Sequence, residues 1–85
     1  DLKKDHKWAY KNRGMAYNRL GKYNLAIRDF DMVINLDPEN QEAYNNRGFA
    51  KKELGDFEGA CQDWKKSKKL GNGEAKIILK NNYCK

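Results

Sequence analysis

Apolar residues recur at helical spacing in five stretches of this chain. A helix brings positions three and four apart onto one face, so such spacing predicts an amphipathic helix. The first stretch shows one continuous face: Ala9, Tyr10, Arg13, Gly14 and Tyr17. The second shows another: Ala26, Ile27, Phe30, Val33 and Ile34. We therefore predict helices over about residues 7–20, 24–36, 41–54, 58–70 and 74–83.

Glycine and proline divide these stretches. Gly21 and Gly55 stand where the first and third helices should stop, which suits a left-handed C-terminal residue. Pro38 ends the second helix, because the residue before a proline is pushed out of the helical region. Gly14 stands in mid-helix despite a cost of about 1 kcal/mol relative to alanine. Since it recurs as Gly48, we expect a neighbouring helix to pass too close for a Cβ atom.

The chain repeats itself with a period of 34 residues. From Tyr10 onward, the identical pairs are Tyr10/Tyr44, Asn12/Asn46, Arg13/Arg47, Gly14/Gly48, Ala16/Ala50, Leu20/Leu54, Gly21/Gly55, Ala26/Ala60, Asp29/Asp63 and Leu36/Leu70. Two aromatic pairs keep their character: Tyr23/Phe57 and Phe30/Trp64. The order Tyr10-x2-Arg13-Gly14-x2-Tyr17, Ala26-x3-Phe30, Pro38 resembles the tetratricopeptide repeat.

This resemblance implies an all-α fold, a right-handed α-solenoid of antiparallel helix pairs with five helices. Residues 7–40 would be the first repeat, 41–72 the second, and 73–85 a C-terminal capping helix whose outer face stays polar. Leu2 lies one period before Leu36, so residues 1–6 are interpreted as the tail of an upstream repeat or a linker.

The resemblance also implies a function, because such repeats bind a peptide or partner segment in a concave groove lined by the first helix of each repeat. Carried onto this sequence, the groove residues are Lys11, Asn12, Met15, Asn18, Arg19, Asn45, Asn46, Phe49 and Lys52, beside Trp8, Glu42 and Glu53. Asn side chains can hydrogen-bond a peptide backbone, while Met15 and Phe49 offer apolar contact unless they are ordinary surface residues.

Some family members clamp a C-terminal carboxylate with basic and Asn side chains. Lys11 and Asn46 match two of those positions, but Met15 stands where that clamp has Asn. The sequence therefore disfavours binding of a chaperone tail.

Charge suggests other partners. The net charge is +6, and residues 61–85 carry 7 basic and 2 acidic groups, whereas residues 1–60 carry 11 and 10. A solvated lysine face is the commoner explanation, and nucleic-acid binding is the alternative. It would use Lys51, Lys52, Lys65, Lys66, Lys68 and Lys69. The aromatics Tyr44, Phe57 and Trp64 fit core positions, which leaves few for base stacking.

A further alternative is self-association, since the N-terminal end could stack on another copy as a homodimer. No run of apolar residues approaches the ~20 needed to span a bilayer.

Catalytic chemistry has little support. The chain has one histidine, His6, with no matching constellation around it, and Asp29, Asp31 and Asp63 should pair with Lys or Arg. We expect no enzyme activity, cofactor or metal site.

The two cysteines allow two interpretations. Cys61 takes the apolar place of Ile27 in the previous repeat, and Cys84 lies at the end of the next helix, so a disulfide could pin the capping helix. Two separate thiols are the other interpretation, which we slightly prefer. A disulfide would require an oxidising compartment, and the sequence alone leaves the compartment open.

Overall fold

The computed structural model describes residues 6–84, which form five α-helices and no strand. The helices are α1 (Lys7–Arg19), α2 (Tyr23–Leu36), α3 (Gln41–Glu53), α4 (Phe57–Lys69) and α5 (Gly73–Asn81). Each predicted helix is present, with ends displaced by one or two residues. The all-α prediction is thus confirmed. Residues 1–5 and 85 lie outside the described part, and so does most of the predicted upstream tail, Leu2 included; His6 is exposed just before α1.

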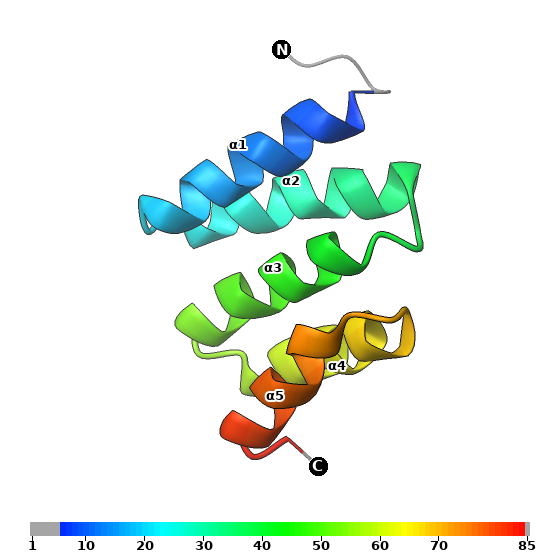
Figure 1. Cartoon of the computed structure of the whole chain (residues 1–85). Coiled ribbons are helices and arrows are strands. Elements are labelled where there is room, and N and C mark those ends of the chain that lie inside the picture. The colour runs from blue at the N-terminus through cyan, green and yellow to red at the C-terminus, as the bar shows by residue number, and fades with distance from the viewer. Residues whose placement is uncertain (1–5, 85) are drawn as a thin grey trace.

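The helices stack in one direction, so that α1 and α5 lie at opposite ends (Figure 1). Helices α1 and α2 form one antiparallel pair and α3 and α4 the next, while α2 packs on α3 and α5 packs on α4. The result is an elongated α-solenoid of 38 × 25 × 16 Å.

The core depends on an aromatic ring laid against a glycine in each pair. A Cβ atom on Gly14 would lie 2.9 Å from Cζ of Phe30, and one on Gly48 would lie 2.6 Å from Nε1 of Trp64. Both rings are almost completely buried. The predicted close approach at the two glycines is confirmed, and it lets the two helices of each pair pack closely against each other.

Turn residues set where each helix begins and ends. Gly21 and Gly55 have φ values of 76° and 91°, the left-handed conformation expected of a helix C-terminus. The side chains of Asn40 and Asn72 cap α3 and α5 by accepting hydrogen bonds from Ala43 N and Glu74 N, both at 3.0 Å. An asparagine thus caps both helices, although Asn40 accepts from the third residue after it and Asn72 from the second.

A disulfide joins α4 to the residues that follow α5. The sulfur atoms of Cys61 and Cys84 are 2.05 Å apart. The structure therefore agrees with the first of the two interpretations that the sequence allowed, a disulfide. It does not agree with the second, two separate thiols, which we slightly preferred. Helix α5 is therefore held to α4 by a covalent bond as well as by packing.

One predicted core aromatic is exposed. Phe57 is the first residue of α4 and has 56% of its surface accessible, although Tyr23, its partner one repeat earlier, is half-buried. Tyr23 packs edge-on against the ring of Phe49, with ring centroids 6.1 Å apart. The position equivalent to Phe49 in α5 is held by a polar residue, Asn81, which is exposed. The expectation that Phe57 lies in the core was wrong.

Candidate functional site

Helices α1, α3 and α5 surround three adjoining hollows that share Asn46. The first, of about 200 Å³, is lined by Met15, Asn18, Arg19, Asn46 and Phe49. The second, of about 260 Å³, is lined by Asn45, Asn46, Phe49, Lys52, Trp64, Ile78 and Asn82. The third, of about 460 Å³, is lined by Met15, Gln41, Glu42, Asn45, Asn46, Asn72 and Glu74. We call these three hollows together the inner groove.

Seven of the nine predicted groove residues line the inner groove: Met15, Asn18, Arg19, Asn45, Asn46, Phe49 and Lys52. Met15 and Phe49 border the same hollow, and 42% of the surface of Phe49 is exposed. Apolar and amide side chains are therefore brought together around one depression. The role of these residues in binding stays a prediction.

The other two predicted residues lie elsewhere. Lys11 is buried, with its ammonium 2.7 Å from Oε1 of Glu42 and 4.6 Å from the centroid of the Trp8 ring. Its side chain is only 9% exposed. Asn12 is exposed on α1 but borders none of the three hollows. Because Lys11 is already paired, it is not a free cation for an incoming carboxylate.

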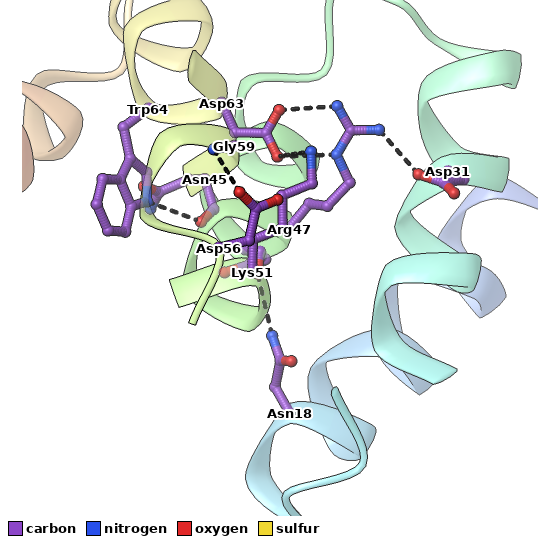
Figure 2. A network of polar contacts seen from close by, with 10 residues as sticks. Asn18, Asp31, Asn45, Arg47, Lys51, Asp56, Gly59, Asp63 and Trp64 are labelled. Atoms are coloured by element: carbon purple, nitrogen blue, oxygen red, sulfur yellow. Dashed lines mark hydrogen bonds and ion pairs between the residues drawn. The ribbon is translucent and has the colours of Figure 1, made fainter. Parts of the chain in front are cut away.

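Two side chains fix the backbone of α3 beneath the groove (Figure 2). Nδ2 of Asn18 donates to the carbonyl oxygen of Asn46 at 3.2 Å, and Nε1 of Trp64 donates to that of Asn45 at 3.3 Å. The Oδ1 atoms of Asn18 and Asn45 are buried and accept no hydrogen bond from a described residue. A buried acceptor without a donor is costly, so these two amide oxygens reduce the stability gained from packing beneath the groove.

Arg47 connects the two helix pairs on the other side of α3. It makes a bidentate ion pair with the buried carboxylate of Asp63 and also donates a hydrogen bond to Asp31 of α2 at 2.8 Å (Figure 2). Lys51 approaches the same Asp63 carboxylate at 3.2 Å. The hydrogen bonds that Arg47 donates to Asp63 raise the pKa of its guanidinium above the ordinary value. This network joins α3 to both α2 and α4.

The expected pairing of the helix carboxylates with basic residues is confirmed. Asp31 and Asp63 pair with Arg47, and Asp29 pairs with Arg13 at 2.8 Å.

Helix α5 supplies groove residues that the sequence interpretation missed. Glu74, Ile78 and Asn82 line the groove, although residues 73–85 were expected only to cover the end of the solenoid. A signal was present: Asn72-x2-Ala75 repeats Asn40-x2-Ala43 at an interval of 32 residues. Ala43 and Ala75 are both completely buried, so α5 occupies the place of the first helix of a third repeat.

Within residues 6–84, no group of three or more His, Cys, Asp and Glu side chains is arranged to hold a metal ion. None of the helices in that range combines the length and apolar character needed to cross a bilayer.

Comparison with known families and structures gives consistent matches. Two tetratricopeptide-repeat family models match residues 8–40 and 30–62. The chain is similar to the first such domain of Spaghetti (RPAP3), solved with the HSP90 peptide SRMEEVD, at 30% identity and a TM-score of 0.85. It is also similar to the second such domain of human RPAP3, solved by NMR with the HSP70 peptide SGPTIEEVD, at 32% identity and a TM-score of 0.86.

The first alignment covers 92% of this chain and 64% of that chain, and the second covers 95% and 69%. The chain thus spans about two thirds of the length of each of these solved chains. A comparison with curated protein sequences gave no match.

Proposed function

The chain belongs to the tetratricopeptide-repeat family, and from that premise we propose that its inner groove binds an extended peptide segment of a protein partner. The observation that carries the proposal is the set of three adjoining hollows that share Asn46 and are lined by amide and apolar side chains. The two similar structures described above hold an HSP90 peptide and an HSP70 peptide, which supports a peptide as the class of ligand.

The chemistry of the groove suits an extended backbone. Asn45, Asn46 and Asn82 each carry a donor and an acceptor, the two groups that a peptide bond also presents. Met15 and Phe49 present apolar surface between these amides. A segment lying across the three helices would exchange hydrogen bonds with the amides and bury one or two apolar side chains, as interface anchors do.

The proposal includes no reaction. Tetratricopeptide-repeat domains are generally interaction modules rather than enzymes, and we assign no catalytic residue to this chain.

A matched pair of aromatic substitutions tests the proposal. Peptides selected from a random displayed library on the wild-type chain would be titrated against Phe49→Ala and Phe57→Ala. Both side chains are exposed, but Phe49 lines the groove and Phe57 lies at the start of α4 beside the disulfide. We expect Phe49→Ala to weaken binding by about tenfold or more, the scale of an aromatic anchor, and Phe57→Ala to leave it unchanged. If the Phe49→Ala and Phe57→Ala variants bind the selected peptides with equal affinity, the proposal that the inner groove binds them is refuted.

Self-association through the N-terminal end is a second proposal. A hollow of about 430 Å³ lies on this end, lined by residues of α1 and α2 that include Tyr10, Arg13 and Met32. The Arg13 side chain is 41% exposed there, whereas that of Arg47 is 18% exposed beneath α2. Light scattering over a range of protein concentrations, with Arg13→Glu as the variant, tests it; a mass independent of concentration and substitution would refute it.

Nucleic-acid binding is the alternative with least support. Lys65, Lys68 and Lys69 are exposed on α4, but Trp64 beside them is 2% exposed and cannot stack on a base. An affinity for single-stranded RNA that falls steeply with salt would favour it.

A further inference from the structure

We propose that the end of the inner groove between Glu42 and Glu74 binds a basic side chain, lysine or arginine, of the peptide segment. This inference rests on the proposed function and adds to it the charge of the ligand. It predicts that the groove binds an internal, basic segment of the partner and not an acidic C-terminal tail.

The largest hollow of the groove carries only negative charge. Its two ionisable lining residues are Glu42 and Glu74, and no lysine, arginine or histidine borders it. Glu74 has no side-chain partner among residues 6–84, and the Glu42 side chain remains 64% exposed even though it pairs with Lys11. Two carboxylates at one end of the groove therefore face whatever enters it.

The nearest cation does not offset this charge for a ligand. Lys11 is covered by the Trp8 ring and bonded to Glu42, so Lys11, Glu42 and Glu74 together carry a net charge of −1 with the positive group buried. An acidic peptide placed here would lie against Glu74 without a free cation to receive it. Like charges at an interface disfavour a partner as effectively as opposite charges favour one.

Hydrogen-bond acceptors dominate the same hollow. Oδ1 of Asn45 is buried and accepts no bond from a described residue, and the amide of Gln41 already donates from Nε2 to the carbonyl oxygen of Leu70. An ammonium or guanidinium group brings only donors. It would meet the two carboxylates that line the hollow.

The opposite end of the groove has the opposite charge. Arg19 borders the hollow between α1 and α3, and Lys52 borders the hollow between α3 and α5. Neither makes an ion pair within residues 6–84, so an acidic side chain of the ligand has its place there. The groove is thus negative where α3 and α5 begin and positive where α1 and α3 end.

The helix dipole explains only part of the placement of these two carboxylates. Glu42 and Glu74 lie in the first turns of α3 and α5, where a carboxylate favours the helix dipole. Glu58 does the same in the first turn of α4, but it lies outside the groove beside Cys61. Glu58 is therefore a matched control, since it shares the helix-terminal role without facing the groove.

The test selects peptides and then reverses the charge. A random displayed library would be selected on wild-type, Glu74→Lys and Glu58→Lys chains at about 0.15 M salt, which screens the distant lysines of α4. We expect peptides from the wild type to be enriched in Lys and Arg. Glu74→Lys should reverse the enrichment towards Asp and Glu, and Glu58→Lys should retain the wild-type profile.

Direct titration gives a second measurement. A selected basic peptide should lose about tenfold in affinity for Glu74→Lys, while the acidic peptide SRMEEVD should bind the wild type more weakly than it binds Glu74→Lys. Tighter binding of SRMEEVD than of any basic peptide by the wild type would overturn the inference.

The two proposals fail in distinguishable ways. Peptide binding that is lost with Phe49→Ala but unaffected by Glu74→Lys overturns the charge inference and leaves the groove intact. Selected peptides that bind equally to Phe49→Ala and wild type overturn the proposed function, and the inference with it.

Discussion

The carboxylate of Asp31 in α2 accepts a hydrogen bond from Arg47 in α3 at 2.8 Å, and this contact crosses from one helix pair to the next. The same guanidinium binds Asp63 of its own pair through two further nitrogen–oxygen contacts at 2.8 and 2.9 Å. One side chain therefore joins three helices behind the groove, and its loss should disturb both pairs at once.

Replacement of Arg47 should be strongly destabilising. Arg47→Met leaves the Asp63 carboxylate, 5% exposed, with Lys51 as its remaining ionic partner among residues 6–84. A buried charge that loses its partner costs about 3 kcal/mol, so we expect the free energy of unfolding in urea to fall by that amount. Asp31→Asn, at a half-exposed site, should cost only about 0.5 kcal/mol. Arg28→Met, an exposed control, should change nothing; a loss at Arg28 equal to that at Arg47 would contradict this account.

A methyl group at Gly48 should destabilise the second pair. In Gly48→Ala the new Cβ would lie 2.6 Å from Nε1 of Trp64, and overpacking of this kind costs about 1–3 kcal/mol. The cost should exceed the gain of about 1 kcal/mol in helix propensity. Gly73→Ala is the control, because nothing lies within 4 Å of a Cβ atom there. Thermal unfolding should give a lower Tm for the first variant only, and a raised Tm for Gly48→Ala would show that the ring can move away.

Reduction of the disulfide should weaken the C-terminal end. Cys61 and Cys84 are 23 residues apart, and closing a loop of that size stabilises a fold by about 2–4 kcal/mol. We expect the reductant dithiothreitol to lower the Tm of the wild type, and the Cys61→Ser/Cys84→Ser double variant to show the lower Tm with or without it. Hydrogen exchange should become faster in α5 before α1. An unchanged Tm on verified reduction would mean that packing alone holds α5.

The Lys7–Asp37 ion pair should contribute to the free energy of unfolding above about pH 4 and should lose that contribution at lower pH. The hydrogen bond from Lys7, at 3.1 Å, holds the pKa of Asp37 below its ordinary value of 3.8. A depressed carboxyl pKa contributes stability that is fully present above the unfolded pKa and lost as pH falls through the folded pKa. Both side chains are about one-third exposed, so the contribution should be about 0.5 kcal/mol.

Urea titrations of the wild type and Asp37→Asn from pH 7 to pH 2 would measure this contribution. The difference between them should be constant down to about pH 4 and should shrink below it. A difference that grows as the pH falls would have the wrong sign.

Much of the fold could be predicted because the repeat carries its own geometry. The recurrence of Gly14 as Gly48 and of Phe30 as Trp64 indicates two equivalent contacts, and both are present. Gly21 and Gly55 likewise predicted the two helix ends. These features depend on residues close in sequence or one period apart, which a single chain displays directly.

The groove was less predictable because its details depend on contacts at other separations. Lys11 was expected to face a ligand, but Glu42, 31 residues later, reaches back to pair with it. The interval of 32 residues between α3 and α5 concealed the equivalence of Glu42 and Glu74 from a search at 34. Phe57 was misplaced because its equivalent, Tyr23, packs on a ring that has no counterpart in α5.

The bond between Cys61 and Cys84 also decides how the chain would respond to mechanical force. Tension applied beyond Cys84 would pass through the sulfur atoms into α4, so α5 would lie outside the stretched path. The far wall of the groove would then keep its shape under load until α4 itself yielded, and single-molecule extension under reducing conditions should release α5 first.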